Sequence, residues 1–193
     1  MTRNPEKVQQ AAAEMLRHLG IDPLPAGMKN TPDRVARMWL ELTAGYDLDP
    51  GTLLKTSFDA DGYDQMIVMR GIDFSSTCEH HLLPFIGRAT VGYLPGEDGR
   101  VVGASKLARV VDCFARRFQI QERMTKQIAD AVEECLNPRA VGVVLVAGHE
   151  CMACRGVRKP RAEFVTSALR GAFRSDPSAR AEFLAFHHHG RQS

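Results

Sequence analysis

Two short segments of this chain combine cysteine, histidine and glutamate at spacings that suit a metal ion. Residues 76–81 read STCEHH, and residues 149–154 read HECMAC. Thiolate together with imidazole is the ligand set that zinc favours in proteins. Each segment also carries a spare histidine, His80 or His149, and water attack at a metal needs such a group to manage protons. The pattern therefore predicts a zinc hydrolase.

The spacing leaves two ligand sets open. If Cys78, His81, Cys151 and Cys154 all bind, the site is a closed Cys₃His site, which is typical of structural zinc. If only three of them bind, the fourth position stays open for water and the site can be catalytic. The spare histidines favour the catalytic alternative. The competing function is that of a binding protein, in which the zinc is structural and no reaction is catalysed.

A second set of residues has the types that bind phosphate and a purine edge. Lys106 and Arg109 lie three residues apart beside Ser105, at an expected helix start where free backbone N–H groups also suit phosphate. Arg155 adds a cation directly after the second metal segment. Glu122, at the start of the next helix, offers a carboxylate that could accept two N–H bonds from guanine. The simpler alternatives are a solvated helix face for the cations and a helix-dipole partner for Glu122.

The length and composition are those of an ordinary globular protein. Its 193 residues, 44% apolar and 25% charged, predict one domain over residues 1–193. A net charge of +2 gives no reason to expect nucleic-acid binding, and no apolar stretch is long enough to cross a membrane. The first residues lack a signal-peptide core, and five cysteines are an odd number, so we expect a reducing cytoplasm.

Periodicity and capping signals predict an α+β fold in which an antiparallel sheet carries helices on one face, after an N-terminal helical hairpin. Asn4 caps a first helix that ends at Gly20, and Thr31–Pro32 begins a second that ends near Gly45. The strands are expected at residues 66–69, 72–74, 89–94, 100–103, 141–146 and 162–166, with a hairpin joining 89–94 to 100–103. The remaining helices are expected at residues 105–118, capped by Ser105, and at 121–136 and 177–186.

Five segments, in this order, resemble the GTP cyclohydrolase I family. They are residues 31–35 (TPDRV), 75–81 (SSTCEHH), 103–109 (GASKLAR), 119–125 (QIQERMT) and 149–157 (HECMACRGV), and the resemblance extends from about Val8 to His188. It implies the tunnelling fold, with an N-terminal helical region over residues 1–48 and a catalytic core over 62–193. It also implies a homo-oligomer, a ring of ten subunits with active sites at the subunit interfaces.

The resemblance assigns roles to individual residues. Cys78, His81 and Cys151 are the implied Zn²⁺ ligands, and Cys154 falls on a position that the family does not use for metal. His149 corresponds to the proton donor to the imidazole ring, and His80 to a second catalytic histidine. Gln121 and Glu122 match the guanine-recognition pair, with Gln121 and Ser105 also in catalytic positions and Ser105 close to the ribose. The implied triphosphate-binding residues are Lys106, Arg109, Arg155 and, reaching a neighbouring subunit's site, Arg34.

The implied reaction is hydrolysis of GTP at C8 of the guanine ring, release of formate and rearrangement of the ribose to give 7,8-dihydroneopterin triphosphate. This is the first step of tetrahydrofolate and pterin biosynthesis. His80 and Ser105 are expected to move protons in the rearrangement, and Glu122 to reject ATP, which lacks the paired donors of guanine. A tunnelling-fold relative that acts on another pterin or deazapurine is a third reading, and the histidines at 80, 81 and 149 argue against it.

Overall fold

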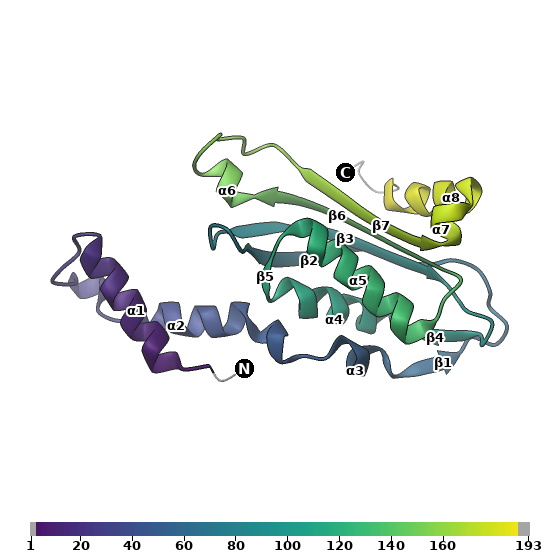
Figure 1. Cartoon of the computed structure of the whole chain (residues 1–193), viewed down its shortest axis with the longest axis horizontal. Coiled ribbons are helices and arrows are strands. Elements are labelled where there is room, and N and C mark those ends of the chain that lie inside the picture. Colours follow the sequence, from purple (N-terminus) through teal and green to yellow (C-terminus); the bar gives the residue numbers. More distant parts are fainter. Residues whose placement is uncertain (1–2, 189–193) are drawn as a thin grey trace.

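The computed structural model describes residues 3–188, and its centre is a five-stranded sheet with the strand order β5-β2-β3-β6-β7 (Figure 1). Pairing is antiparallel except between β5 and β2, which run parallel. A separate two-stranded antiparallel ribbon joins β1 and β4. The strands are β1 (Ser57–Asp59), β2 (Ile67–Cys78), β3 (Pro84–Leu94), β4 (Arg100–Val102), β5 (Phe118–Gln119), β6 (Ala140–His149) and β7 (Phe164–Gly171).

Two long helices cover one face of the sheet. The helix α4 packs against β2, and α5 packs against β6 and β7. The helices in the described part of the chain are α1 (Pro5–His18), α2 (Thr31–Leu42), α3 (Pro50–Leu54), α4 (Ala104–Ala115), α5 (Gln121–Leu136), α6 (Glu150–Ala153), α7 (Ala172–Ser175) and α8 (Pro177–His188), with short 3₁₀ turns at Ala26–Met28 and Ala44–Asp47. The predicted α+β class, with an antiparallel sheet and helices packed on one face, is confirmed, and α7 and α8 in addition cover part of the opposite face.

The strand β6 is buried on both faces, which explains its unbroken apolar sequence. Val141, Val143 and Leu145 belong to the main core beneath α4 and α5. Their neighbours Ala140, Val144 and Val146 point to the opposite face and form a smaller cluster with Phe173 of α7 and Phe183 of α8. Because side chains alternate along a strand, the same apolar run serves two cores.

The N-terminal helical hairpin is confirmed, and it projects away from the sheet (Figure 1). Asn4 caps α1 by accepting a hydrogen bond from the Lys7 backbone N–H, and Gly20 follows the helix at a φ of +83°. Trp39 of α2 contacts Phe118 of β5, with ring centroids 5.6 Å apart. This contact connects the hairpin to the edge strand β5.

The predicted hairpin between residues 89–94 and 100–103 is wrong. The strand β3 is paired on both sides, with β2 and β6, so it has no free edge for the segment that follows it. The segment pairs instead with β1, and its Val102 N–H donates to the Tyr93 hydroxyl at 3.0 Å.

Several element boundaries also differ from the predictions, among them those of α4, β2 and β7. The helix α4 begins at Ala104 with no side-chain capping bond, so Ser105 lies inside the first turn and is not the cap. The two short strands expected at 66–69 and 72–74 form the single strand β2, which bulges between Met69 and Ile72 where Gly71 has a φ of +68°. The last strand, β7, runs from residue 164 to 171 instead of 162 to 166.

No helix within residues 3–188 is long and apolar enough to cross a membrane.

The packing of α8 on β6 gives a stability prediction. A Cβ added at Gly142 would lie 2.6 Å from two carbons of the buried Phe183 ring. We expect Gly142→Ala to lower the free energy of unfolding by about 1–3 kcal/mol, the usual cost of overpacking a core, as measured by urea titration at fixed protein concentration. Gly148→Ala on the same strand is the control, because nothing lies within 4 Å of its added Cβ. Equal stability of the two variants would contradict the described packing.

Candidate metal and catalytic site

The central strand β3 brings the two metal-type segments together. It pairs antiparallel with both β2 and β6, so those two strands run in the same direction and end at the same edge of the sheet. Phe85 of β3 lies opposite Ser76 of β2 on one side and opposite His149 of β6 on the other. The segments that follow, the turn between β2 and β3 and the helix α6, therefore lie at the same end of the sheet (Figure 1).

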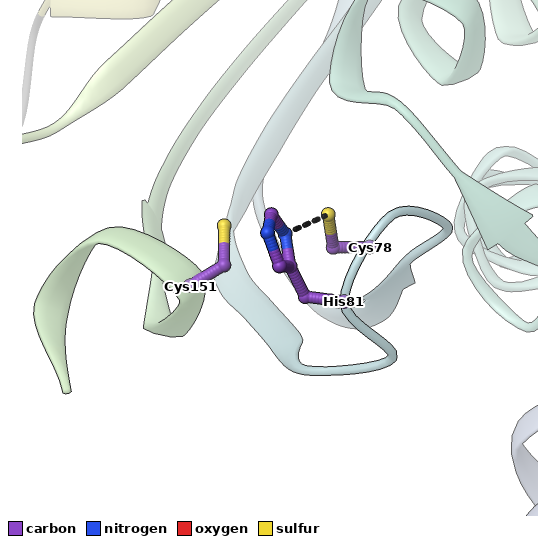
Figure 2. Close-up of side chains that lie close together, drawn as sticks. All are labelled: Cys78, His81 and Cys151. Atoms are coloured by element: carbon purple, nitrogen blue, oxygen red, sulfur yellow. Dashed lines mark hydrogen bonds between the residues drawn. The ribbon is translucent and has the colours of Figure 1, made fainter. Parts of the chain in front are cut away.

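Three of the predicted ligands form one cluster, shown in Figure 2. The ligand atoms of Cys78, His81 and Cys151 all lie within 4.8 Å of one another, and Cys78 Sγ is 4.0 Å from His81 Nδ1. Cys78 is the buried last residue of β2, His81 is exposed in the turn that follows, and Cys151 lies in α6. Burial raises the pKa of the Cys151 thiol, and the nearby Cys78 raises it further. Two thiols and an imidazole that converge in this way fit a bound metal cation, which would favour their deprotonated forms.

Cys154 lies outside this cluster. Its thiol is exposed and donates to the Glu150 carbonyl oxygen at 3.0 Å, across one turn of backbone. Within residues 3–188 the cluster therefore offers three potential protein ligands and no fourth, which is the arrangement typical of catalytic metal sites.

An ion pair that the sequence did not indicate holds the loop between the first two ligands. Arg123 of α5 donates to the carboxylate of Glu79, which lies between Cys78 and His81 in the sequence. The same guanidinium donates to Gln119 Oε1 at 3.1 Å and to the Phe118 carbonyl at 3.1 Å. Its hydrogen bond to Glu79 lowers the pKa of that carboxyl. The ion pair attaches the loop that carries Cys78 and His81 to the start of α5. The sequence alone does not indicate it, because Glu79 and Arg123 lie far apart along the chain.

His149 sits between aromatic rings at the end of β6. Its ring stacks on Phe85, with centroids 4.7 Å apart and planes 1° apart, and meets the edge of Phe164 at 5.6 Å. Its Nε2 lies 2.9 Å from Gln121 Oε1. Burial lowers the pKa of His149, and the nearby carboxylate of Glu122 acts in the opposite direction. The two residues that begin α5 therefore both lie close to this histidine.

The other predicted site residues divide into two groups. His80 is exposed beside Glu79, and Arg155 lies close enough to Cys151 to influence its thiol, so both belong to the metal end of the sheet. Ser105, Lys106 and Arg109 lie in the first half of α4, which begins next to β4 (Figure 1).

The structure does not bring this second group to the metal cluster within one chain. The end of α4 approaches β5, which pairs with the Cys78 end of β2, and Ser105 lies about 15 Å back along the helix from Ala115 at 1.5 Å per residue. Arg34 is exposed on α2, in the hairpin that projects from the sheet.

Comparison with known proteins identifies relatives along nearly the whole chain. The profile of the family described as GTP cyclohydrolase I matches residues 8–188. A GTP cyclohydrolase 1 from Dehalococcoides mccartyi is 49% identical over 180 residues, covering 93% of this chain and 95% of the relative. A GTP cyclohydrolase 1 from Mycolicibacterium vanbaalenii is 53% identical over 178 residues, covering 92% and 88%. Among solved structures, the apo archaeosine synthase QueF-Like aligns with a TM-score of 0.47 at 17% identity, over 56% of this chain and 96% of that one.

The geometry of the two cysteines predicts which of them the metal needs. We expect Cys151→Ser to lose most of the metal that the wild-type chain holds, because one of three converging ligands becomes a poor donor. Cys154→Ser, three residues away, is the matched control and should keep its full metal content, measured by elemental analysis after extensive dialysis. Loss of metal from the Cys154 variant would restore the closed four-ligand alternative.

Proposed function

This chain belongs to the GTP cyclohydrolase I family, and we propose that it hydrolyses the guanine imidazole ring of GTP, releases formate and forms 7,8-dihydroneopterin triphosphate. The observation that carries the proposal is the cluster of Cys78, His81 and Cys151 at the same sheet edge as His149. A three-ligand metal site beside a half-buried histidine is what hydrolysis of a ring carbon requires. The reaction begins tetrahydrofolate and pterin synthesis.

We propose zinc as the metal, held by Cys78, His81 and Cys151. Two thiolates and an imidazole are borderline-soft ligands that suit Zn²⁺, and the resemblance implies the same set. When bound, zinc acts as a Lewis acid that makes a water nucleophile available at neutral pH. The buried Cys78 and the Arg123–Glu79 ion pair keep two of the ligands in place before the metal arrives.

His149 is the proposed acid that protonates N7 of the purine, which makes C8 electrophilic. Phe85 and Phe164 hold the ring in one plane, and burial lowers its pKa, so the protonated form gives up its proton readily. His80 is exposed beside the metal loop, with its Nε2 3.8 Å from a Glu79 carboxylate oxygen, so it can exchange protons with solvent. This placement supports a role for His80, with Ser105, in the later proton transfers of the ribose rearrangement.

Glu122 is the proposed reader of guanine. It is exposed on the first turn of α5, close enough to His149 to influence its pKa. A carboxylate there accepts bonds from the N1–H and 2-amino groups together, and adenine has no such pair of donors. Gln121 stands beside it at the same helix start.

The triphosphate site is proposed to form between subunits. Arg155 lies next to the metal cluster. The residues in the first half of α4, far from that end of the sheet, are Ser105, Lys106 and Arg109. Arg34 lies on α2, in the hairpin that projects from the sheet. A homo-oligomeric ring, decameric by the resemblance, would bring one chain's α4 to its neighbour's metal. We place this enzyme in the cytoplasm, a location supported by five free cysteines.

The direct test incubates the zinc-loaded chain with GTP and, separately, with ATP. We expect GTP alone to give both formate and a pterin that fluoresces after oxidation, because only guanine offers Glu122 two adjacent donors. Formate is measured enzymatically and the pterin by fluorescence. A folded, zinc-bearing protein that releases no formate from GTP would point to the structural-zinc alternative.

The role of Glu122 gives a separate prediction. We expect Glu122→Ala to lower kcat/KM for GTP roughly 10- to 100-fold, the effect of losing hydrogen bonds to a charged group. Glu134→Ala is the matched control, since Glu134 is an exposed carboxylate at the other end of α5. The measurement is the steady-state kcat/KM for GTP of both variants. Equal values would show that Glu122 does not recognise guanine.

A further inference from the structure

The side chain of Gln121 is buried, with 1% of its surface exposed, and its hydrogen bonds determine which way its amide faces. The amide Nε2 donates to the Leu145 carbonyl of β6 at 3.1 Å and to the Phe164 carbonyl of β7 at 2.9 Å. Carbonyl oxygens only accept hydrogen bonds, so the opposite orientation would face oxygen against oxygen at both positions. The amide nitrogen therefore faces the sheet, and the amide oxygen faces His149.

A chain of hydroxyl groups fixes the same orientation independently. Thr125 donates to the Gln121 backbone carbonyl at 2.7 Å, which uses its only hydroxyl hydrogen. In the 2.6 Å contact between Thr125 and Thr166, the donor is therefore Thr166. Thr166, its own hydrogen committed, accepts from Gln121 Nε2 at 3.1 Å. The bonds run in one direction around a closed ring, from the Gln121 side chain through both threonines to the Gln121 backbone.

This orientation dictates where His149 carries its hydrogen. Gln121 Oε1 can only accept, so His149 Nε2, 2.9 Å away, must donate. Within residues 3–188, no hydrogen bond is made to His149 Nδ1. The neutral ring is then the Nε2–H tautomer, and Nδ1 is the nitrogen that gains or gives the catalytic proton.

We propose that Gln121 is a positioning residue that fixes the tautomer and direction of His149, and that its side chain does not bind guanine. The inference rests on the proposed function for the role of His149 as an acid, and it deepens that function by naming Nδ1 as the proton-transferring atom. The amide hydrogens of Gln121 are committed to protein oxygens and its amide oxygen accepts from His149, and with 1% of the residue exposed the amide has no free donor and no exposed acceptor to offer a substrate.

The tautomer can be observed directly by ¹⁵N–¹H correlation spectroscopy of the zinc-loaded full chain, labelled on histidine nitrogens, at a pH where the ring is neutral. The His149→Gln variant identifies the His149 signals among the seven histidines. We expect the pattern of an Nε2–H imidazole. An Nδ1–H pattern for His149 in the folded wild-type protein would overturn the proposal.

Two substitutions of Gln121 test the positioning role. Gln121→Met removes the acceptor at similar size, so we expect both tautomers in the spectrum. We expect kcat for GTP to fall roughly 10- to 100-fold, part of what a positioned acid contributes. Gln121→Glu keeps an oxygen acceptor for His149. Burial favours the neutral acid, whose O–H can replace one amide donor to the sheet carbonyls, so this variant should retain the Nε2–H pattern and recover part of kcat.

In both variants KM for GTP should stay within about threefold of wild type, since uniform substrate binding is not lost. A raised KM with unchanged kcat in Gln121→Met would show instead that the side chain binds guanine, and would overturn the proposal. Wild-type protein that releases no formate would count against the proposed function alone, because the spectrum reports the tautomer without turnover.

Discussion

The antiparallel pairing of β3 with both β2 and β6 decides where every group of the metal end lies. Because β3 reverses direction relative to each neighbour, β2 and β6 must end together, and the row through Phe85 aligns Ser76 with His149. A shift of one residue in either register would turn the end of that strand to the opposite face and separate the ligands. The burial of alternate side chains on both faces of β6 makes such a shift costly, so the two cores hold the site in register.

The aromatic ring of Phe85 shows how closely the core and the chemistry are joined. It is fully buried, meets Phe74 edge-on at 6.0 Å and stacks on His149. The Phe85 side chain is therefore part of the apolar core, and it also contacts one face of the His149 ring and fixes the plane of that ring. The ring of hydrogen bonds through Gln121, Thr125 and Thr166 extends this rigidity into a polar region, where each buried group is satisfied and its direction is defined.

Local signals in the sequence predicted the elements well, and the pairing of distant elements poorly. Asn4, Gly20 and Pro32 identified the N-terminal helices because capping and termination depend on neighbouring residues alone. The turn-rich residues 95–99 suggested a hairpin because the sequence does not reveal that both edges of β3 are already occupied. For the metal site, residue type and spacing selected Cys78, His81, Cys151 and Cys154 as candidates, and only the family resemblance left Cys154 out of the ligand set. The surroundings of Gln121 were not predictable, since its partners Leu145 and Phe164 offer only backbone carbonyls that any residue could supply. The sequence also did not indicate that Ser105 and Lys106 lie at the end of α4 that is far from the metal ligands.

The wide separation of the ligands along the chain gives a bound metal a second effect. Cys78 and His81 follow β2, whereas Cys151 lies beyond β3, α4, α5 and β6. A metal held by all three is a reversible cross-link that closes a very long loop, in the way that a disulfide does. It therefore removes conformational freedom from the unfolded chain, and this entropic effect grows with the logarithm of loop length. Removing the metal with a chelator would therefore also remove the cross-link that constrains the unfolded chain between His81 and Cys151.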